Sequence, residues 1–242
     1  MQELCFEVCV ETLEAAQAAE AGGASRVELC AELAIGGVTP SLELLAATLK
    51  AIRIPVRVLI RPRGGDFVYS AEEFECMLGQ VDAVKSAGAA GVVVGVLRAD
   101  GSVDVERSRA LVERARPMGT TFHRAFDETR NLDEALEDVM ATGAECLLTS
   151  GGQPDVLTGA ETIARLRRAA VGRMTVMAGG GLRLTNLADV VRRTGVTYLH
   201  GSLKRNRAGE DVTVDAQVLE ADVREAVWLF RLALRTREEM AG

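Results

Sequence analysis

The chain carries only two histidines, and each stands at the end of a short β-like segment. His123 lies in the stretch TFHRAFD (121–127), and His200 lies in YLHGS (198–202). Histidine is the side chain whose charge changes most readily near neutral pH, which suits it to acid–base chemistry. Two such residues at strand ends indicate a chemical site that is assembled where the strands stop.

An arginine-rich turn is the second candidate for chemistry. The stretch RPRGGDF (61–67) follows a strand-like segment and holds Arg61, Arg63 and Asp66. The forked guanidinium group of arginine matches carboxylate and phosphate groups. We therefore expect these residues to converge on a binding site. The alternative is a surface loop with a local pair between Arg63 and Asp66.

Glycine-rich turns end three later segments, namely SGG (150–152), AGGG (178–181) and HGS (200–202). Glycine lets the backbone approach a ligand closely, and backbone N–H groups can bind an anion. Tight turn geometry alone is the alternative. Together with the arginine-rich turn, the candidate anion-binding residues are Arg63, Asp66, Ser150, Gly151, Gly179, Gly180, Gly181, His200, Gly201 and Ser202.

Two of the five cysteines end a repeated pattern, Glu-Val-Cys at 7–9 and Glu-Leu-Cys at 28–30. Neighbouring strands lie about 4.8 Å apart, so Cys9 and Cys30 are expected to face each other. Two thiolates at that separation could hold a soft ion such as Cu(I). A buried free cysteine is also an ordinary small core residue, and four zinc ligands are not evident in the sequence.

The elements that must position these residues repeat at even spacing. Short apolar segments alternate with alanine- and leucine-rich stretches of helical periodicity, which predicts strand–helix units. The strand-like segments are 4–10, 26–30, 56–61, 91–95, 120–124, 146–150, 174–179 and 197–201, and the last helix is expected at about 221–238. Eight such units in a chain of this length predict an α/β protein with a single (β/α)8 barrel domain over residues 1–242. A doubly wound sheet is the rival, but the GxGxxG turn typical of it is missing.

Side chains alternate along a strand, so the alternation predicts which residues point into the barrel. The inward set is Cys5, Glu7, Cys9, Glu28, Cys30, Arg57, Leu59, Arg61, Thr121, His123, Tyr198 and His200. Buried charge is costly unless it is paired, so we expect a network that joins Glu7, Glu28 and Arg61. Active sites of such barrels lie at the C-terminal strand ends, which makes Glu7, Glu28, Arg61 and His123 the candidate catalytic residues. A purely structural ion-pair network is the alternative.

Composition narrows the choice of partners and compartment. The formal net charge of −7 provides no basic field, so we expect neither nucleic acid nor a membrane surface as a partner. No segment approaches the ~20 apolar residues of a membrane span, and the N-terminal stretch MQELCFEVCV lacks the basic start of a signal peptide. An odd number of cysteines in a long chain fits reduced thiols. We therefore expect a cytoplasmic protein.

Several of these motifs together resemble the CutC family of copper-homeostasis proteins. The similarity is carried by RVELCAELAIGGVTPS (26–41), IRPRGGDFVYS (60–70), TFHRAFD (121–127), LTSGG (148–152) and MAGGG (177–181), and it extends from about residue 4 to residue 206. The resemblance implies a (β/α)8 barrel, a cytoplasmic location, a homodimer or larger homo-oligomer, and a role in copper tolerance or trafficking. It also implies that Cys9 and Cys30 are ligands of Cu(I). We expect no organic cofactor.

Two functions remain open on the sequence. In the first, the protein carries or buffers a copper ion on its two cysteines. In the second, it is an enzyme, a lyase, isomerase or hydrolase, that acts on a small phosphorylated or carboxylated metabolite. The glycine turns and Lys204 would hold the anion, Arg61 and Arg63 would orient a second polar group, and Glu28 or Glu7 with His123 would supply acid–base catalysis. The interior charges favour the second function, because a copper carrier needs only two thiols. A binding scaffold ranks third, because it leaves those charges unexplained.

Overall fold

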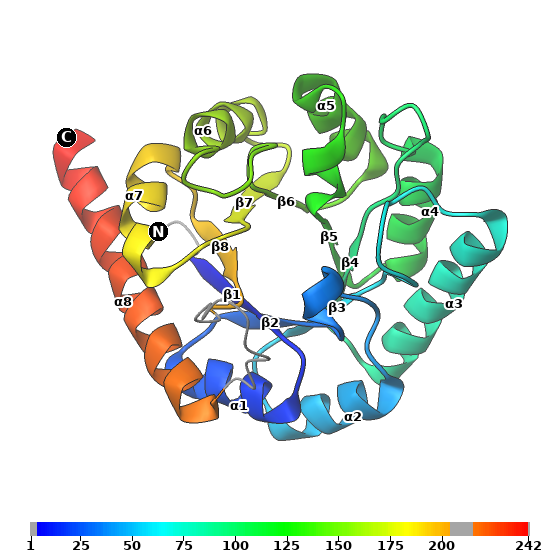
Figure 1. The fold of residues 1–242 in the computed structure, drawn as a ribbon, viewed down its shortest axis with the longest axis horizontal. Helices are drawn as coiled ribbons and strands as arrows, with labels where there is room; N and C mark the ends of the chain where they lie inside the picture. Colours follow the sequence, from blue (N-terminus) through cyan, green and yellow to red (C-terminus); the bar gives the residue numbers. More distant parts are fainter. Residues whose placement is uncertain (1–3, 204–214, 242) are drawn as a thin grey trace.

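The computed structural model describes residues 4–203 and 215–241, and its strands form one closed parallel barrel (Figure 1). Each strand pairs with the next one along the chain, and the last pairs with the first. The strands are β1 (Cys5–Val10), β2 (Arg26–Leu29), β3 (Val56–Leu59), β4 (Gly91–Val94), β5 (Gly119–Phe122), β6 (Cys146–Thr149), β7 (Thr175–Gly179) and β8 (Tyr198–Gly201). The predicted (β/α)8 barrel is confirmed.

A ring of helices surrounds the barrel, one after each strand (Figure 1). They are α1 (Leu13–Gly22), α2 (Leu42–Ala51), α3 (Ala71–Ala87), α4 (Val105–Ala115), α5 (Leu132–Thr142), α6 (Ala160–Ala169), α7 (Leu184–Thr194) and α8 (Ala216–Ala241), with short 3₁₀ turns η1 (Leu33–Ile35) and η2 (Arg124–Glu128). Side-chain caps fix several starts. Ser70 and Glu73 form a reciprocal capping box before α3, and Asn131 caps α5.

Helix α8 begins at Ala216 rather than near residue 221, and it extends beyond 238. The reason is a buried apolar stripe at helical spacing, which already starts at Leu219 and continues through Val223, Ala226 and Phe230. This stripe closes the ring against α1 and α7 (Figure 1). At Gly22 a β-carbon would lie 2.6 Å from the Val223 side chain, so glycine permits the close contact between α1 and α8.

The barrel wall separates two environments. Outward side chains such as Phe6, Val8 and Leu29 join the main apolar core beneath the helices. Inward side chains form small separate clusters, one of Cys9, Cys30, Leu59 and Val93 and one of Cys146, Leu148, Met177 and Tyr198. Charged groups are also buried in the described part of the chain, among them Glu7, Arg26 and Glu28. The alternation of side chains therefore placed the interior residues correctly.

None of the described helices is both long enough and apolar enough to cross a membrane.

Candidate functional site

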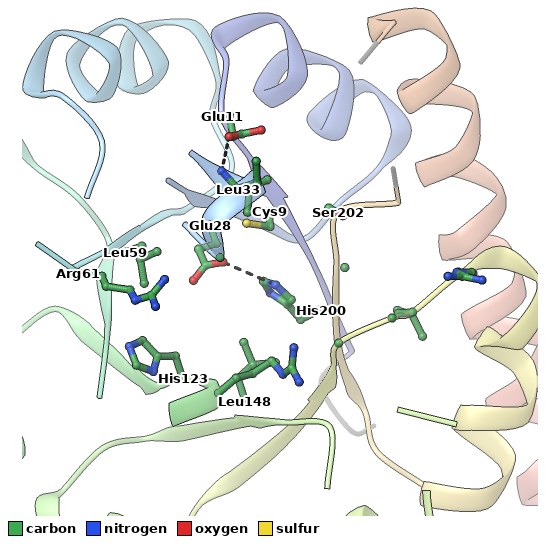
Figure 2. A pocket seen from close by; sticks show the side chains of 18 of the residues that line it. Cys9, Glu11, Glu28, Leu33, Leu59, Arg61, His123, Leu148, His200 and Ser202 are labelled. Carbon is green, nitrogen blue, oxygen red and sulfur yellow. Dashed lines mark hydrogen bonds and ion pairs between the residues drawn. The ribbon is translucent and has the colours of Figure 1, made fainter. Parts of the chain in front are cut away.

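A cavity of about 660 Å³ opens at the C-terminal ends of the strands. Its volume lies within the range of about 300–1,000 Å³ that is typical of small-molecule sites. Figure 2 shows Cys9, Glu28 and His200 on one side of it, and Arg61 and His123 on another. These residues come from the ends of β1, β2, β8, β3 and β5, which is where (β/α)8 barrels place their active sites.

Beneath the cavity lies a fully buried carboxylate, Glu7, which does not line it. Glu7 forms an ion pair with Arg26, and Glu7 Oε1 accepts a hydrogen bond from His200 Nδ1 at 2.8 Å. Burial opposes the ionisation of Glu7, but the bond from His200 and the charge of Arg26 outweigh it and lower its pKa to about 2. Glu7 is therefore an anchored anion at neutral pH.

The expected network of Glu7, Glu28 and Arg61 does not form, so that prediction is wrong. Arg26 takes the place of Arg61 as the partner of Glu7, because strand pairing sets Glu7 opposite Arg26. Arg61 sits one level higher and donates to main-chain oxygens instead: Nη1 to Gly37 at 2.9 Å and Nη2 to Gly65 at 2.6 Å. The sequence reasoning missed Arg26, although the alternation that turns Glu28 inward also turns Arg26 inward.

His200 links Glu7 to the second buried carboxylate, Glu28. His200 Nε2 lies 3.6 Å from Glu28 Oε2, and both side chains line the cavity (Figure 2). Burial raises the pKa of Glu28, supported by the charge of Glu7 and opposed by that of His200. Burial by itself would lower the pKa of His200, but Glu28 and Glu7 raise it. The three groups form a chain of proton-binding sites that ends at the cavity surface.

The two cysteines of the repeated pattern meet as predicted. Cys9 Sγ lies 3.4 Å from Cys30 Sγ, and both thiols are free and buried. Cys9 lines the cavity, whereas Cys30 lies behind it and is fully enclosed. The contact with Cys30, burial and the charge of Glu28 raise the pKa of Cys9 well above its usual value, so its thiol is protonated at neutral pH. The other buried cysteines, Cys5 and Cys146, lie outside the cavity lining.

The opposite wall is made by Arg61, His123 and Phe67. The Phe67 ring lies under the Arg61 guanidinium at 4.7 Å and against the His123 ring at 4.9 Å. Burial and the charge of Arg61 lower the pKa of His123 to about 3, so its ring is neutral. Its Nδ1 accepts the Ala125 N–H at 3.1 Å, which leaves the proton on Nε2. Both His123 Nε2 and Arg61 Nε are buried and have no hydrogen-bond partner within the described part of the chain.

Arg63 and Asp66 do not converge on the cavity. Arg63 donates to Asp66 Oδ1 at 3.0 Å and to Glu73 Oε1 at 2.6 Å on the outer surface. Neither Arg63 nor Asp66 is among the residues that line the cavity. The structure therefore has the local surface pair that the sequence left as the alternative, because Asp66 and Glu73 hold the Arg63 guanidinium away from the cavity lining.

The glycine turns divide into two groups. Gly180, Gly181, Gly201 and Ser202 line the cavity beside His200. Gly180 and Gly181 have φ values of +105° and +71°, which favour glycine, and they turn the backbone between β7 and α7. Gly179 lies in β7 against His200 and is not part of the lining. The predicted anion site after the seventh and eighth strands thus has a compact set of candidates.

The turn after β6, which was predicted to bind an anion, instead binds a side chain of the protein itself. Ser150 N and Gly152 N donate to the carboxylate of Asp127, at 2.9 and 3.0 Å, and Gly151 N donates to Thr149 Oγ1. These amides are occupied by internal acceptors, and neither Ser150 nor Gly151 lines the cavity. Two arginines that the sequence reasoning did not select for binding, Arg124 and Arg183, line the cavity. Lys204 lies outside the described residues.

The fold and this site define the class: a (β/α)8-barrel protein with a polar cavity at the C-terminal face of its barrel. The model of the CutC family matches residues 4–205, and the chain belongs to that family. A family protein CutC from Chromobacterium violaceum is 48% identical over 199 residues, which cover 82% of this chain and 81% of that protein. Another, from Porphyromonas gingivalis, is 46% identical over 201 residues, 83% of this chain and 81% of that one.

Solved structures agree with this assignment. The crystal structure of the CutC protein from Streptococcus agalactiae superposes with a TM-score of 0.78 at 29% identity, covering 84% of this chain and 100% of that one. A thiamine phosphate pyrophosphorylase from Pyrococcus furiosus gives a TM-score of 0.63 at 16% identity, with coverage of 96% and 97%. The second likeness is one of fold alone.

Proposed function

We propose that this protein acts in copper homeostasis by binding one Cu(I) ion between Cys9 and Cys30. The observation that carries the proposal is the separation of 3.4 Å between the two Sγ atoms, on adjacent strands. Soft thiolate ligands select Cu(I). The Streptococcus agalactiae relative bears copper homeostasis in its name.

Access to the two thiols is one-sided. Cys9 borders the cavity and Cys30 is fully enclosed behind it, so an incoming ion meets Cys9 first. Because Cys9 is held as a thiol by Cys30, burial and Glu28, binding of Cu(I) must displace its proton. The copper affinity should therefore increase as the pH rises.

An anaerobic titration with Cu(I) against a competing chelator tests the proposal. The wild-type protein should bind one ion per chain, and Cys9→Ser or Cys30→Ser should abolish this binding. Two matched controls remove other thiols, Cys76→Ser on the exposed face of α3 and Cys146→Ser at the far end of the barrel, and both should bind as wild type does. Unchanged Cu(I) affinity in the Cys9→Ser/Cys30→Ser double variant would refute the copper role.

A second function is favoured by the proton-binding chain of Glu7, His200 and Glu28 beside the cavity. In this alternative the protein is an enzyme that acts on a small phosphorylated or carboxylated metabolite. Glu28 and His200 would exchange protons with the substrate. The rim of the cavity formed by Gly180, Gly181, Gly201 and Arg183 would hold its anionic group. His123 moves from the predicted acid–base role to that of a neutral donor, because its ring is neutral and its Nδ1 already accepts the Ala125 N–H.

Binding of anions can be measured without knowing the reaction. A panel of phosphorylated and carboxylated metabolites, with inorganic phosphate as the simplest probe, should raise the melting temperature of the wild-type protein. Arg183→Ala should weaken that effect, whereas Arg192→Ala, an ion-paired arginine in the helix that follows Arg183, should not. Equal responses in the two variants would count against an anion site at this rim.

A further inference from the structure

We infer that Cys9, Glu28 and His200 form a three-ligand centre for a divalent cation of the zinc class, open on one side to the cavity. This site goes beyond the proposed copper function, because it uses two ligands that a Cu(I)–dithiol site does not need. The three residues come from β1, β2 and β8, which are neighbours in the barrel. Figure 2 shows their side chains turned toward one another.

Their ligand atoms are already close. One atom from each residue, the Cys9 sulfur, a Glu28 oxygen and a His200 nitrogen, lies within 4.8 Å of the others, and all three residues are buried. Zinc binds sulfur at about 2.3 Å and nitrogen or oxygen at about 2.0–2.2 Å, so ligand atoms around a tetrahedral ion are about 3.3–3.6 Å apart. His200 Nε2 and Glu28 Oε2, at 3.6 Å, match this spacing. The Cys9 sulfur lies within 4.8 Å of both, so a rotation of its side chain could complete the set.

The orientation of His200 supports the same centre. Its Nδ1 donates to Glu7 Oε1 at 2.8 Å, and Glu7 is held in turn by Arg26. This leaves the Nε2 lone pair directed toward Glu28. Histidines that bind metals usually donate their other ring nitrogen to a carboxylate, which fixes the ring and its tautomer. Glu7 is thus a positioning residue rather than a ligand.

The arrangement also leaves room for a fourth ligand. All three residues line the cavity, so an ion among them would face it. Zinc centres with three protein ligands and an open position are the catalytic type, whereas structural sites use four. The opposite wall presents Arg61 and the unpartnered Nε2 of His123. An oxyanion bound to the metal would meet these donors.

The copper site and this centre share only Cys9, so single substitutions separate them. Cys30→Ser should remove Cu(I) binding and keep the divalent centre. Glu28→Gln and His200→Asn should remove the divalent centre and keep Cu(I) binding. Failure of one proposal is therefore visible independently of the other.

The test uses the full-length reduced protein, freed of metal and titrated with Co²⁺ as a spectroscopic probe and Zn²⁺ as a competitor. We expect one Co²⁺ per chain, with a charge-transfer band of one thiolate, and displacement by Zn²⁺. Cys9→Ser, Glu28→Gln and His200→Asn should weaken Co²⁺ binding by more than about 100-fold, and Glu7→Gln by about 10–100-fold. Cys30→Ser, Cys76→Ser and Glu11→Gln, a carboxylate elsewhere in the cavity lining, should bind as wild type does.

Three results would overturn the inference: no saturable Co²⁺ binding, a band of two thiolates, or binding that survives in His200→Asn and Glu28→Gln but is lost in Cys30→Ser. Circular dichroism spectra show whether each variant folds. Where a variant does not fold, the number of thiolates in the wild-type Co²⁺ spectrum decides, because one thiolate with oxygen and nitrogen ligands supports the centre and any other set refutes it.

Discussion

Breaking the ion pair of Glu7 and Arg26 should be one of the most destabilising single changes in this barrel. The Glu7 side chain is fully buried, and the Arg26 side chain is only 10% exposed. The Arg26 guanidinium also lies over the Tyr198 ring at 5.5 Å. Replacing Arg26 by Met keeps most of its apolar stem and leaves the Glu7 carboxylate without its strongest cationic partner.

The expected loss follows from these contacts. Removing one partner of a buried ion pair costs about 3–5 kcal/mol, and the contact with Tyr198 contributes about 1 kcal/mol within that loss. We therefore expect Arg26→Met to lower the free energy of unfolding by about 4 kcal/mol. For a chain of this length, about 2–4 °C of melting temperature corresponds to each kcal/mol, so the midpoint should fall by about 8–16 °C.

A double-mutant cycle separates the charge from the packing. Arg26→Met/Glu7→Gln carries no unpaired charge, so it should be more stable than Arg26→Met alone by about 2 kcal/mol or more. The matched control is Arg57→Met, an inward arginine of similar burial whose partner Glu145 is 61% exposed, and it should cost much less. Equal losses for Arg26→Met and Arg57→Met, or a double variant no more stable than Arg26→Met, would refute the reasoning.

Three further results are expected. The pKa of His123 is lowered from 6.5 to about 3, so only the unfolded chain takes up this proton as the pH falls through that window. Between pH 7 and pH 5 the free energy of unfolding, measured with urea, should therefore fall by about 2 kcal/mol more in the wild-type protein than in His123→Asn. Equal losses in the two proteins would contradict this. Asp127→Asn replaces a carboxylate oxygen that accepts from the Ser150 and Gly152 amides by an NH2 group, so it should lower the free energy of unfolding by about 1–3 kcal/mol and speed hydrogen exchange of the Gly152 amide. Unchanged exchange at Gly152 would argue against an anchoring role of Asp127. Trp228 on α8 is 60% exposed, so Trp228→Glu should shift the expected homodimer toward monomer in a sedimentation experiment. A sedimentation profile identical to that of the wild-type protein would exclude this face of α8 from the dimer contact.

The fold could be predicted from local patterns because each strand–helix unit repeats the same signals. Apolar segments at regular spacing fixed the eight units, and the alternation of side chains assigned Glu7, Cys9 and His200 to the interior. The pairing of Cys9 with Cys30 followed because both end the same pattern on successive strands. These inferences need only the period of a strand and the order of the chain.

The partners inside the barrel could not be predicted in the same way. Alternation gives the side of a strand on which a residue lies, but not its height in the barrel, which depends on how far neighbouring strands are offset. The observed pairing sets Glu7 beside Arg26 and His200, and Cys9 beside Glu28. Arg61 lies nearer the C-terminal ends of the strands, where it donates hydrogen bonds to the main-chain oxygens of Gly37 and Gly65. The hydrogen bonds of the turn after β6 could not be predicted either, because they depend on the carboxylate of Asp127, which is distant in the sequence.

Because the proposed copper site and the proposed divalent centre both need Cys9, we expect the two ions to compete for its sulfur. Cys9 lies between the two sets of ligands, with Cys30 behind it and with Glu28 and His200 on the cavity side. A Cu(I) ion that draws the Cys9 sulfur toward Cys30 removes it from His200. Adding Cu(I) to the Co²⁺-loaded protein should therefore abolish the thiolate charge-transfer band in proportion to the copper bound. A band that persists unchanged at full copper occupancy would refute this competition for Cys9.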